Sequence, residues 1–452
     1  MPEIKTKQPR SFFSSLSFRS ILVGLLMLLM LIPLVMVDGI VNERSRYHND
    51  VVYNISKGWG GDQSITGPIL AVPYVEHQIS VETITASDGK SRTVSRDIFK
   101  DKTMILLPEV LNIDTKLKEA HRKRGIYDSL VYKAEIELSG QFDLSALPKE
   151  SNRYSIHWKK AWLAVGVSDT KAINSTSPLD WDGSRTKFEP GTRMTKIISS
   201  GFHANMVNTF SKETKGGLRP EFKVQLIVNG SRRFRFTPLG ETTFATVKSG
   251  WPHPSFQGDV LPNSKIISNE GFTAEWTIPH LARNYPQSWL MGENYHLKEL
   301  TAGVDLFTPV SLYSKVIRAV KYGILFIGLT FLVFLIFEVT VKARLHIIQY
   351  AIIGLSLTLF YLLLISLSEH IPFLMAYIYA ASTIVGIITL YTIAVLKSLG
   401  KGVFIMLLLG SLYTALYFIL QMEDYALLAG SGVMLFVMVV LMIVTRKIQH
   451  TD

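Results

Sequence analysis

The sequence of 452 residues contains no cysteine. This absence excludes disulfide bonds, thiol catalysis and cysteine-ligated metal sites. The nucleophile elbow GxSxG, the zinc motif HExxH and the phosphate loop GxxxxGK followed by Ser or Thr are also missing, and these are common signatures of hydrolases and nucleotide-binding enzymes. We therefore expect a protein that is not an enzyme, with no catalytic residues, no cofactor and no bound metal.

Charged residues are scarce, at 18% of the chain against 48% hydrophobic residues, and the formal net charge is +11. The excess of Lys and Arg does not form an arginine-rich tract or a known nucleic-acid-binding module. We expect no nucleic-acid partner. Anionic lipid head groups are the better match for this basic charge, so membrane lipids are expected partners.

Long apolar stretches dominate both ends of the chain, and each has about the length that an α-helix needs to cross a hydrocarbon core. They are residues 21–37, 322–341, 347–366, 373–395, 402–420 and 425–444. A large polar region separates the first stretch from the other five. The sequence therefore predicts an α-helical integral membrane protein with six transmembrane helices, one before and five after a large extramembrane domain.

Lysine and arginine gather in the segments that alternation of the helices places on one side of the membrane. These residues are Lys5, Lys7, Arg10 and Arg19 in the tail 1–20, Lys342 and Arg344, Lys397 and Lys401, and Arg446 and Lys447 in the tail 445–452. The loops 368–370 and 421–424 have none. We predict cytoplasmic N- and C-termini in a multi-pass inner-membrane protein. Residues 38–321 are then periplasmic.

The first span is predicted to be an uncleaved anchor that continues as a helical stalk over residues 38–61. Apolar residues recur there at helical spacing, at Ile40, Tyr47, Val51 and Ile55. A cleaved signal peptide is the alternative. A second helical stalk is expected over residues 309–321, leading into a five-helix transmembrane bundle over residues 322–444.

Residues 62–308 follow the two-residue period of β-strands. Residues 134–138 and 222–228 alternate, and Asn229-Gly230 after the second run predicts a hairpin turn. We expect a mostly-β domain, with two packed sheets as one arrangement. Whether it is one unit or two stays open, and a join near residues 170–190 is the candidate boundary.

Glu338 is an ionisable residue within a predicted span, and such residues are costly to bury and often functional. Lys342 lies four residues further on, so an ion pair on one helix face is the simplest interpretation. A role in proton or substrate movement is the alternative. Glu369 and His370 lie in the loop after the third predicted span, where a polar turn is favoured over a gate or relay.

Several long segments resemble the CreD family of inner-membrane proteins. They are NGSRRFRFTPLGETTFATVKSGWPHPSFQGDVLPNSKIISNEGFTAEWTIPHLARNYPQ (residues 229–287), GVDLFTPVSLYSKVIRAVKYGILFIGLTFLVFLIFE, LHIIQYAIIGLSLTLFYLLLISLSEHIPF, LIPLVMVDGIVNERSRYHNDV and TGPILAVPY. The resemblance covers nearly the whole chain. It implies an inner-membrane protein of Gram-negative bacteria that is associated with cell-envelope integrity and a two-component regulon. The family has no established catalytic residues, so the resemblance assigns none here.

Two functions are compatible with these patterns. The first is a non-enzymatic inner-membrane protein that supports cell-envelope integrity or a stress response, with the periplasmic β domain binding an unknown periplasmic or cell-envelope partner. The alternative is a transporter or lipid-handling protein that uses the five-helix bundle. The sequence indicates neither the ligand nor the oligomeric state.

Overall fold

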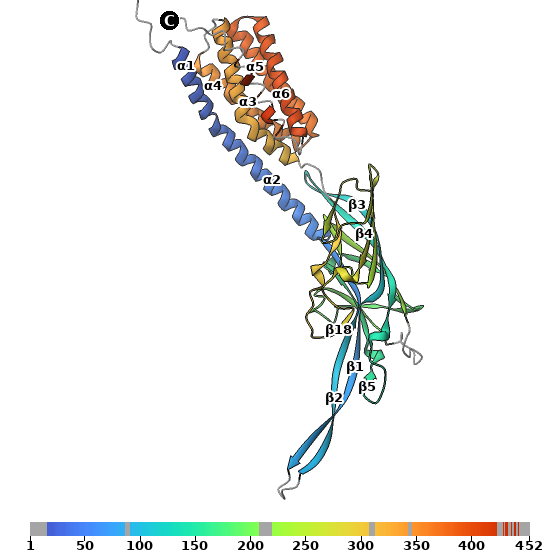
Figure 1. Cartoon of the computed structure of the whole chain (residues 1–452). Helices are drawn as coiled ribbons and strands as arrows, with labels where there is room; N and C mark the ends of the chain where they lie inside the picture. Colours follow the sequence, from blue (N-terminus) through green and yellow to red (C-terminus); the bar gives the residue numbers. More distant parts are fainter. Residues whose placement is uncertain are drawn as a thin grey trace, which may run out of the picture. The chain divides into compact units, whose positions relative to one another are not determined.

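The computed structural model describes residues 16–85, 91–207, 219–306, 312–341 and 346–422, with scattered positions from 428 to 442 (Figure 1). The described residues fall into two compact units. One combines Met1–Asp50 with Val310–Asp452, and the other is Val51–Pro309. We call them the helical unit and the β unit.

The helices occur at both ends of the described chain. They are α1 (Leu16–Leu29), α2 (Leu31–Trp59), α3 (Leu312–Val341), α4 (Ile347–Ser368), α5 (Phe373–Leu396) and α6 (Leu399–Gln421). α1 and α2 follow each other with only a turn at Met30, across which i to i−4 hydrogen bonds continue. Among the described residues, five helical segments are long and apolar enough to cross a membrane. The predicted sixth span, 425–444, falls largely outside the described residues.

Aromatic side chains fill the interior of the helix bundle. The Phe360 ring packs at 4.6 Å from that of Tyr413 and at 5.5 Å from that of Tyr377. The Tyr377 hydroxyl donates to the Tyr413 carbonyl at 2.6 Å, which satisfies a polar group that would be costly to bury alone. Leu390 and Leu407 are exposed on the outside of the same helices, as expected for side chains that face lipid.

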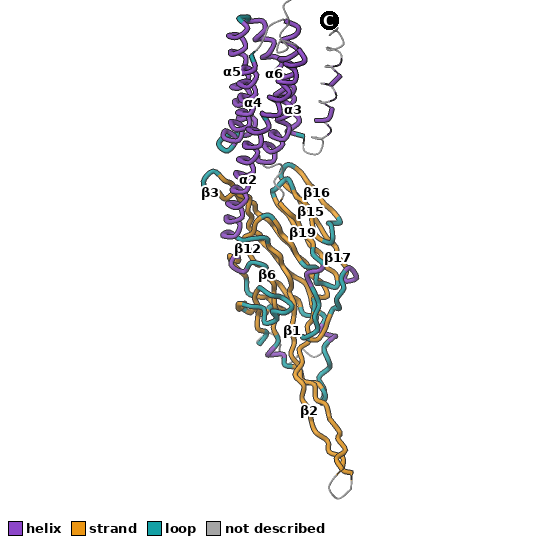
Figure 2. The backbone as a smooth tube through the Cα atoms, turned by 90° about the vertical axis from the view of Figure 1, so that its left-hand side faces the viewer, coloured by secondary structure: helices purple, strands orange, loops and turns teal. Residues whose placement is uncertain are grey.

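The β unit contains two sheets (Figure 2). The ten-stranded sheet runs β10 (Phe188–Pro190), β11 (Gly201–Asn205), β6 (Trp162–Val167), β1 (Gln63–Thr85), β13 (Arg233–Phe236), β19 (Ala302–Leu306) and β15 (Pro254–Gly258), with β2 (Ser91–Leu106), β5 (Tyr154–Ile156) and β18 (Ser288–Leu290) attached. The nine-stranded sheet runs β16 (Ser264–Ser268), β17 (Gly271–Pro279), β14 (Thr242–Ser249), β3 (Pro108–Arg124), β4 (Tyr127–Phe142), β12 (Glu221–Ser231), β8 (Leu179–Trp181) and β9 (Ser184–Thr186), with β7 (Ile173–Thr176) attached.

One hydrophobic core joins the two sheets. Phe236 of the ten-stranded sheet packs edge-on against Trp276 of the nine-stranded sheet, with the ring centroids 5.5 Å apart. Trp181 is almost fully buried and lies 5.6 Å from Phe142 within the same core. Residues Val51–Pro309 therefore form a single compact unit, and the suggested join near residues 170–190 is not a domain boundary.

The predicted hairpin turn at Asn229-Gly230 is wrong. β12 continues straight through both residues, which pair with Lys133 and Tyr132 of β4. A Cβ atom at Gly230 would collide with the Tyr132 ring, so the glycine permits a close approach within a strand and does not form a turn. The chain changes direction at Arg232, where φ is 63°, and then enters the other sheet as β13.

β1 and β2 extend beyond the neighbouring strands as a two-stranded ribbon (Figures 1 and 2). An ion-pair cluster lies where β5 pairs with β1, near the base of this ribbon. The Glu76 carboxylate is 6% exposed and binds the Lys102 ammonium at 2.7 Å and the Arg153 guanidinium at 3.2 Å. Hydrogen bonding, above all from Lys102, lowers the pKa of Glu76 to about 2.

We predict that this cluster makes the β unit sensitive to acid. A depressed carboxylate pKa adds stability above the unfolded-state value of about 4.3, and this stability is lost as the pH falls toward 2. The unfolding temperature of the purified full-length protein should therefore fall less steeply between pH 6 and pH 3 for Glu76→Gln than for the native chain. Glu82→Gln, on an exposed ribbon position, should keep the native pH dependence. Identical pH profiles for Glu76→Gln and the native chain would contradict the prediction.

Candidate functional site

The face of the nine-stranded sheet that points away from the core carries a regular array of charged side chains. In β3 the buried residues Ile113 and Leu117 alternate with exposed Asp114 and Lys116. The same alternation in β4, β12 and β14 places polar side chains on the outer face, because successive residues of a strand point to opposite sides. One face of the sheet thus builds the core, and the other is available to a ligand.

This outer face contains a groove of about 490 Å³, which we call the sheet groove. β3, β4, β7, β12 and β14 contribute to its lining. Its charged and polar side chains include Asp114, Lys116, Glu135, Glu137, Gln225, Thr246 and Lys248. A volume of this order is typical of sites for small molecules or for a part of a larger ligand.

Two of the carboxylates in the sheet groove are held by neighbouring side chains. Lys118 binds Glu135 at 2.5 Å. Lys223 binds Glu137 at 2.7 Å, and the Gln225 amide donates to the same carboxylate at 2.7 Å. The hydrogen bond from Lys118 lowers the pKa of Glu135, and that from Lys223 lowers the pKa of Glu137, so both carboxylates stay ionised at neutral pH. The groove therefore has fixed charges, which suit recognition of a polar ligand.

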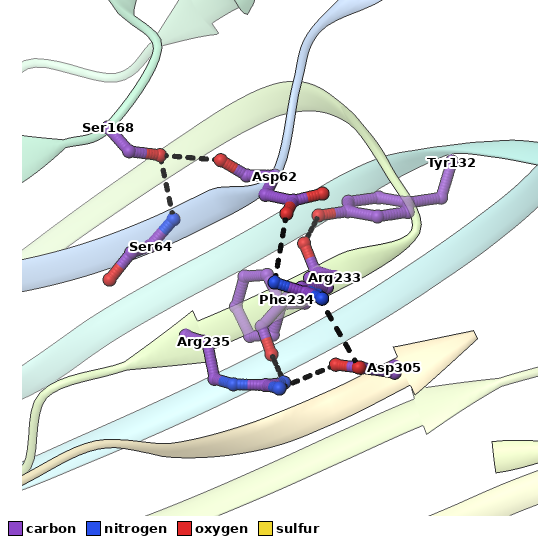
Figure 3. Close-up of polar contacts among 8 residues, drawn as sticks. All are labelled: Asp62, Ser64, Tyr132, Ser168, Arg233, Phe234, Arg235 and Asp305. Carbon is purple, nitrogen blue, oxygen red and sulfur yellow. Dashed lines mark hydrogen bonds and ion pairs between the residues drawn. The ribbon is translucent and has the colours of Figure 1, made fainter. Parts of the chain in front are cut away.

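A second polar cluster connects the strands by which the chain enters and leaves the β unit (Figure 3). Asp62 directly precedes β1, and Asp305 lies near the end of β19. Arg233 of β13 lies between them, 3.6 Å from the Asp62 carboxylate and 3.5 Å from that of Asp305. Arg235 binds Asp305 at 2.6 Å. We call these four residues the arginine clamp.

The backbone around the clamp is held by further hydrogen bonds. The Tyr132 hydroxyl donates to the Arg233 carbonyl at 2.5 Å, and the Ser168 hydroxyl donates to the Asp62 carbonyl at 2.8 Å (Figure 3). Burial raises the pKa of Asp62 despite the opposing effect of Arg233. The clamp therefore includes a carboxylate whose ionisation depends on the arginine beside it.

The end of α2 is attached firmly to the β unit next to this clamp. The Trp59 indole N–H donates to the Tyr132 carbonyl at 3.2 Å, and the Arg122 guanidinium lies 4.0 Å from the centre of the Trp59 ring. Gly60 follows, and a Cβ atom there would lie 2.5 Å from the Asn229 carbonyl oxygen. The Ser231 hydroxyl donates to the Gly60 carbonyl at 2.9 Å. The last residues of α2 are thus held against the strands within the β unit.

Sequence reasoning missed the arginine clamp and the sheet groove. The alternation in β4 predicts that Glu135 and Glu137 share a face, but the lysines that pair with them lie on other strands, Lys118 on β3 and Lys223 on β12. Asp62, Arg233 and Asp305 likewise lie far apart in the chain, and no motif spacing connects them. Only strand pairing brings these charges together.

Glu338 lies near the end of α3 and is buried, with 8% of its surface exposed. The Tyr350 hydroxyl of α4 donates to its carboxylate at 3.2 Å. The Tyr350 ring packs edge-on against Phe331 and Phe334. Lys342 lies outside the described residues, so the expected ion pair between Glu338 and Lys342 stays a prediction.

Glu369 caps the C-terminus of α4, and its carboxylate accepts a hydrogen bond of 3.0 Å from the Tyr313 hydroxyl at the start of α3. The His48 ring of α2 lies 5.2 Å from the Tyr313 ring. His370 is exposed, and its backbone N–H bonds the Leu367 carbonyl as part of the turn. Glu369 therefore connects two helices, whereas His370 forms no side-chain hydrogen bond or ion pair with the described residues.

In the part of the chain that the structure describes, no group of three or more His, Asp and Glu side chains is placed to hold a metal ion.

Comparison with known proteins gives one extensive match. The model of the family described as "Inner membrane protein CreD" matches residues 15–451. Inner membrane protein CreD of Escherichia coli (strain K12) is 33% identical over 427 residues, covering 93% of this chain and 90% of the relative.

Solved structures of an M1 zinc metallopeptidase from Deinococcus radiodurans resemble part of the chain at 10% identity. The TM-score is 0.21, over 44% of this chain and 42% of the peptidase. A mutant of this peptidase bound to a Tyr-Ser-Ala substrate gives 0.20 over the same shares. Scores this low carry no argument about fold or activity.

We predict that Asp305→Asn weakens the arginine clamp, because both arginines lose their shared carboxylate. A loss of about 1–3 kcal/mol in the free energy of unfolding is expected for charge-assisted hydrogen bonds of this kind. Chemical denaturation of the full-length protein, followed by tryptophan fluorescence, measures it. Asp101→Asn, at an exposed position of β2, makes the same change in charge and should alter stability far less. Equal effects of the two substitutions would show that the clamp adds nothing specific.

Proposed function

The chain belongs to the CreD family of inner membrane proteins, and from this premise we propose that it is a non-enzymatic protein that supports cell-envelope integrity. The β unit acts as its binding module and takes a periplasmic or cell-envelope component as ligand. The five-helix bundle and the first helix anchor this module in the inner membrane.

The sheet groove is the observation that carries the proposal. Two of its carboxylates, Glu135 and Glu137, are held by lysines and an amide, so this part of the charged surface is preorganised before a ligand arrives. The groove lies on a sheet whose other face is packed into the core, and such a rigid base favours specific binding. No nucleophile and base are paired in its lining among the described residues, which favours binding over catalysis.

The distribution of Lys and Arg supports a periplasmic position for the β unit, with both termini in the cytoplasm. In that position the sheet groove would meet soluble periplasmic molecules, cell-wall components or lipid head groups. The arginine clamp ties together the strands that lead to α2 and toward α3, so that a ligand-induced shift would reach both connections to the membrane.

We predict that filling the sheet groove abolishes protection of the envelope. Thr246→Trp places a large side chain in the groove, whereas Thr277→Trp places the same side chain on the same face outside the groove lining. Each variant would be expressed in a strain that lacks its own member of this family, at equal membrane levels. Survival under envelope-damaging agents should be lost with Thr246→Trp and kept with Thr277→Trp. Full protection by both variants would refute a role for the groove.

A transporter or lipid-handling role is the second candidate, and the buried Glu338 favours it. A carboxylate inside a bundle is costly and often lies on a path for protons or substrate. Here its described partner is a tyrosine hydroxyl on the next helix, held in place by two phenylalanines. This arrangement equally suits a structural link between α3 and α4.

We predict that Glu338→Gln leaves envelope protection within about twofold of the native level, because the amide oxygen can still accept the Tyr350 hydrogen bond. Tyr350→Phe serves as a matched test of the same contact and should also be mild. Survival in the same deletion strain measures both. Loss of protection with Glu338→Gln alone, at normal membrane levels, would indicate that the carboxylate charge is needed and would favour the transport alternative.

A further inference from the structure

The charges in the sheet groove are not all neutralised within the protein. Glu135 and Glu137 are paired with Lys118 and Lys223. Three charged residues of the lining remain, Lys116, Lys248 and Asp114, and none of these three forms a side-chain ion pair or hydrogen bond with the described residues. The groove thus presents two positive charges and one negative charge to whatever occupies it.

Lys116 and Lys248 lie directly opposite each other on the parallel strands β3 and β14. Like charges in this position repel each other and destabilise a sheet. The acid opposite Lys116 on β4 is Glu135. Lys118 binds this carboxylate directly, and Lys116 adds only a weaker charge attraction to it. The two ammonium groups therefore gain most from an anion between them, and lysines bind phosphate well as point charges.

The surroundings of this lysine pair provide further hydrogen-bonding groups. Lys116 and Lys248 line both the sheet groove and an adjoining hollow of about 310 Å³. Thr246 and Ser175 belong to the lining of the groove, and Thr273 belongs to that of the hollow. Hydroxyl groups can donate to the remaining oxygens of an anion that the lysines hold.

Asp114 lies two residues before Lys116 on the same face of β3. Two residues of a strand span about 7 Å, so an amine held by Asp114 would lie a short distance from an anion held by the lysines. A carboxylate beside a bare anion site would weaken binding by repulsion. It strengthens binding only when the ligand carries its own positive charge at that position.

We propose that the sheet groove binds a phosphate group that carries a primary amine a few bonds away, the chemistry of phosphoethanolamine. Lys116 and Lys248 hold the phosphate, and Asp114 holds the ammonium group. A phosphate monoester with two negative charges and an ammonium group complements the three unpaired side chains in both sign and number. This assignment rests on the proposed role of the β unit as a binding module and names its ligand class.

Isothermal titration calorimetry on the purified full-length protein in detergent tests the proposal. The probes are O-phosphoethanolamine, inorganic phosphate and ethanolamine, with dihexanoyl phosphatidylethanolamine below its micellar concentration as the lipid-borne form. O-phosphoethanolamine should bind more tightly than phosphate or ethanolamine. Tighter binding of the short-chain lipid than of O-phosphoethanolamine would identify a lipid head group as the source, and the reverse order would identify a soluble ligand.

The substitutions separate the two halves of the site. Lys116→Gln and Lys248→Gln should each weaken O-phosphoethanolamine about tenfold, and weaken phosphate as well, as expected when one charge-assisted hydrogen bond is lost. Asp114→Asn should weaken O-phosphoethanolamine but not phosphate. Lys160→Gln, at an exposed position outside the groove, is the matched control and should change neither.

The proposal is overturned if none of the phosphate-bearing probes binds at millimolar concentration. It is also overturned if the native chain and both lysine variants bind O-phosphoethanolamine with equal affinity. An equal effect of Asp114→Asn on phosphate and on O-phosphoethanolamine would overturn the role of the amine. The Thr246→Trp survival assay is independent of these titrations. If Thr246→Trp loses protection but the native chain does not bind O-phosphoethanolamine, the proposed ligand is rejected and the proposed function of the groove is kept. If Thr246→Trp protects normally but the native chain binds O-phosphoethanolamine, the proposed function is rejected and the ligand is kept.

Discussion

The insertion of β13 between β1 and β19 is the constraint on which the β unit depends. β1 begins the unit and β19 ends it, so β13 brings the two ends of a long chain segment into one sheet. Arg233 then lies between Asp62 and Asp305, and its charge offsets two carboxylates that would otherwise repel each other across a partly buried site. The connections toward α2 and α3 thereby start from two strands that both pair with β13.

The same topology explains why one sheet has a face available for recognition. Residues of both sheets share a single core that includes Trp276, Phe236 and Trp181, so the inner faces are fully used. In the nine-stranded sheet the two-residue alternation over parts of β3, β4, β12 and β14 leaves every second side chain there on the opposite face. Charges on that face are fixed by register, which places Lys116 of β3 directly opposite Lys248 of β14.

Much of this architecture could be predicted from local patterns. Apolar length indicates the membrane helices, and helical spacing after residue 38 matches the continuation of α2 to Trp59. Local sequence patterns do not predict the role of a residue whose contacts come from distant parts of the chain. Gly230 resembles a turn residue but makes room for the Tyr132 ring, and Glu338 has a described partner, Tyr350, on another helix. The groove and the clamp were beyond sequence reasoning because long-range strand pairing creates them.

A single strand, β12, runs from the groove to the neighbourhood of the clamp. Its Gln225 side chain holds Glu137 in the groove, and its last residue, Ser231, bonds the Gly60 carbonyl at the end of α2. Arg233 follows two residues later, and the Tyr132 hydroxyl fixes its carbonyl. β12 therefore connects the groove to the end of α2 within the β unit.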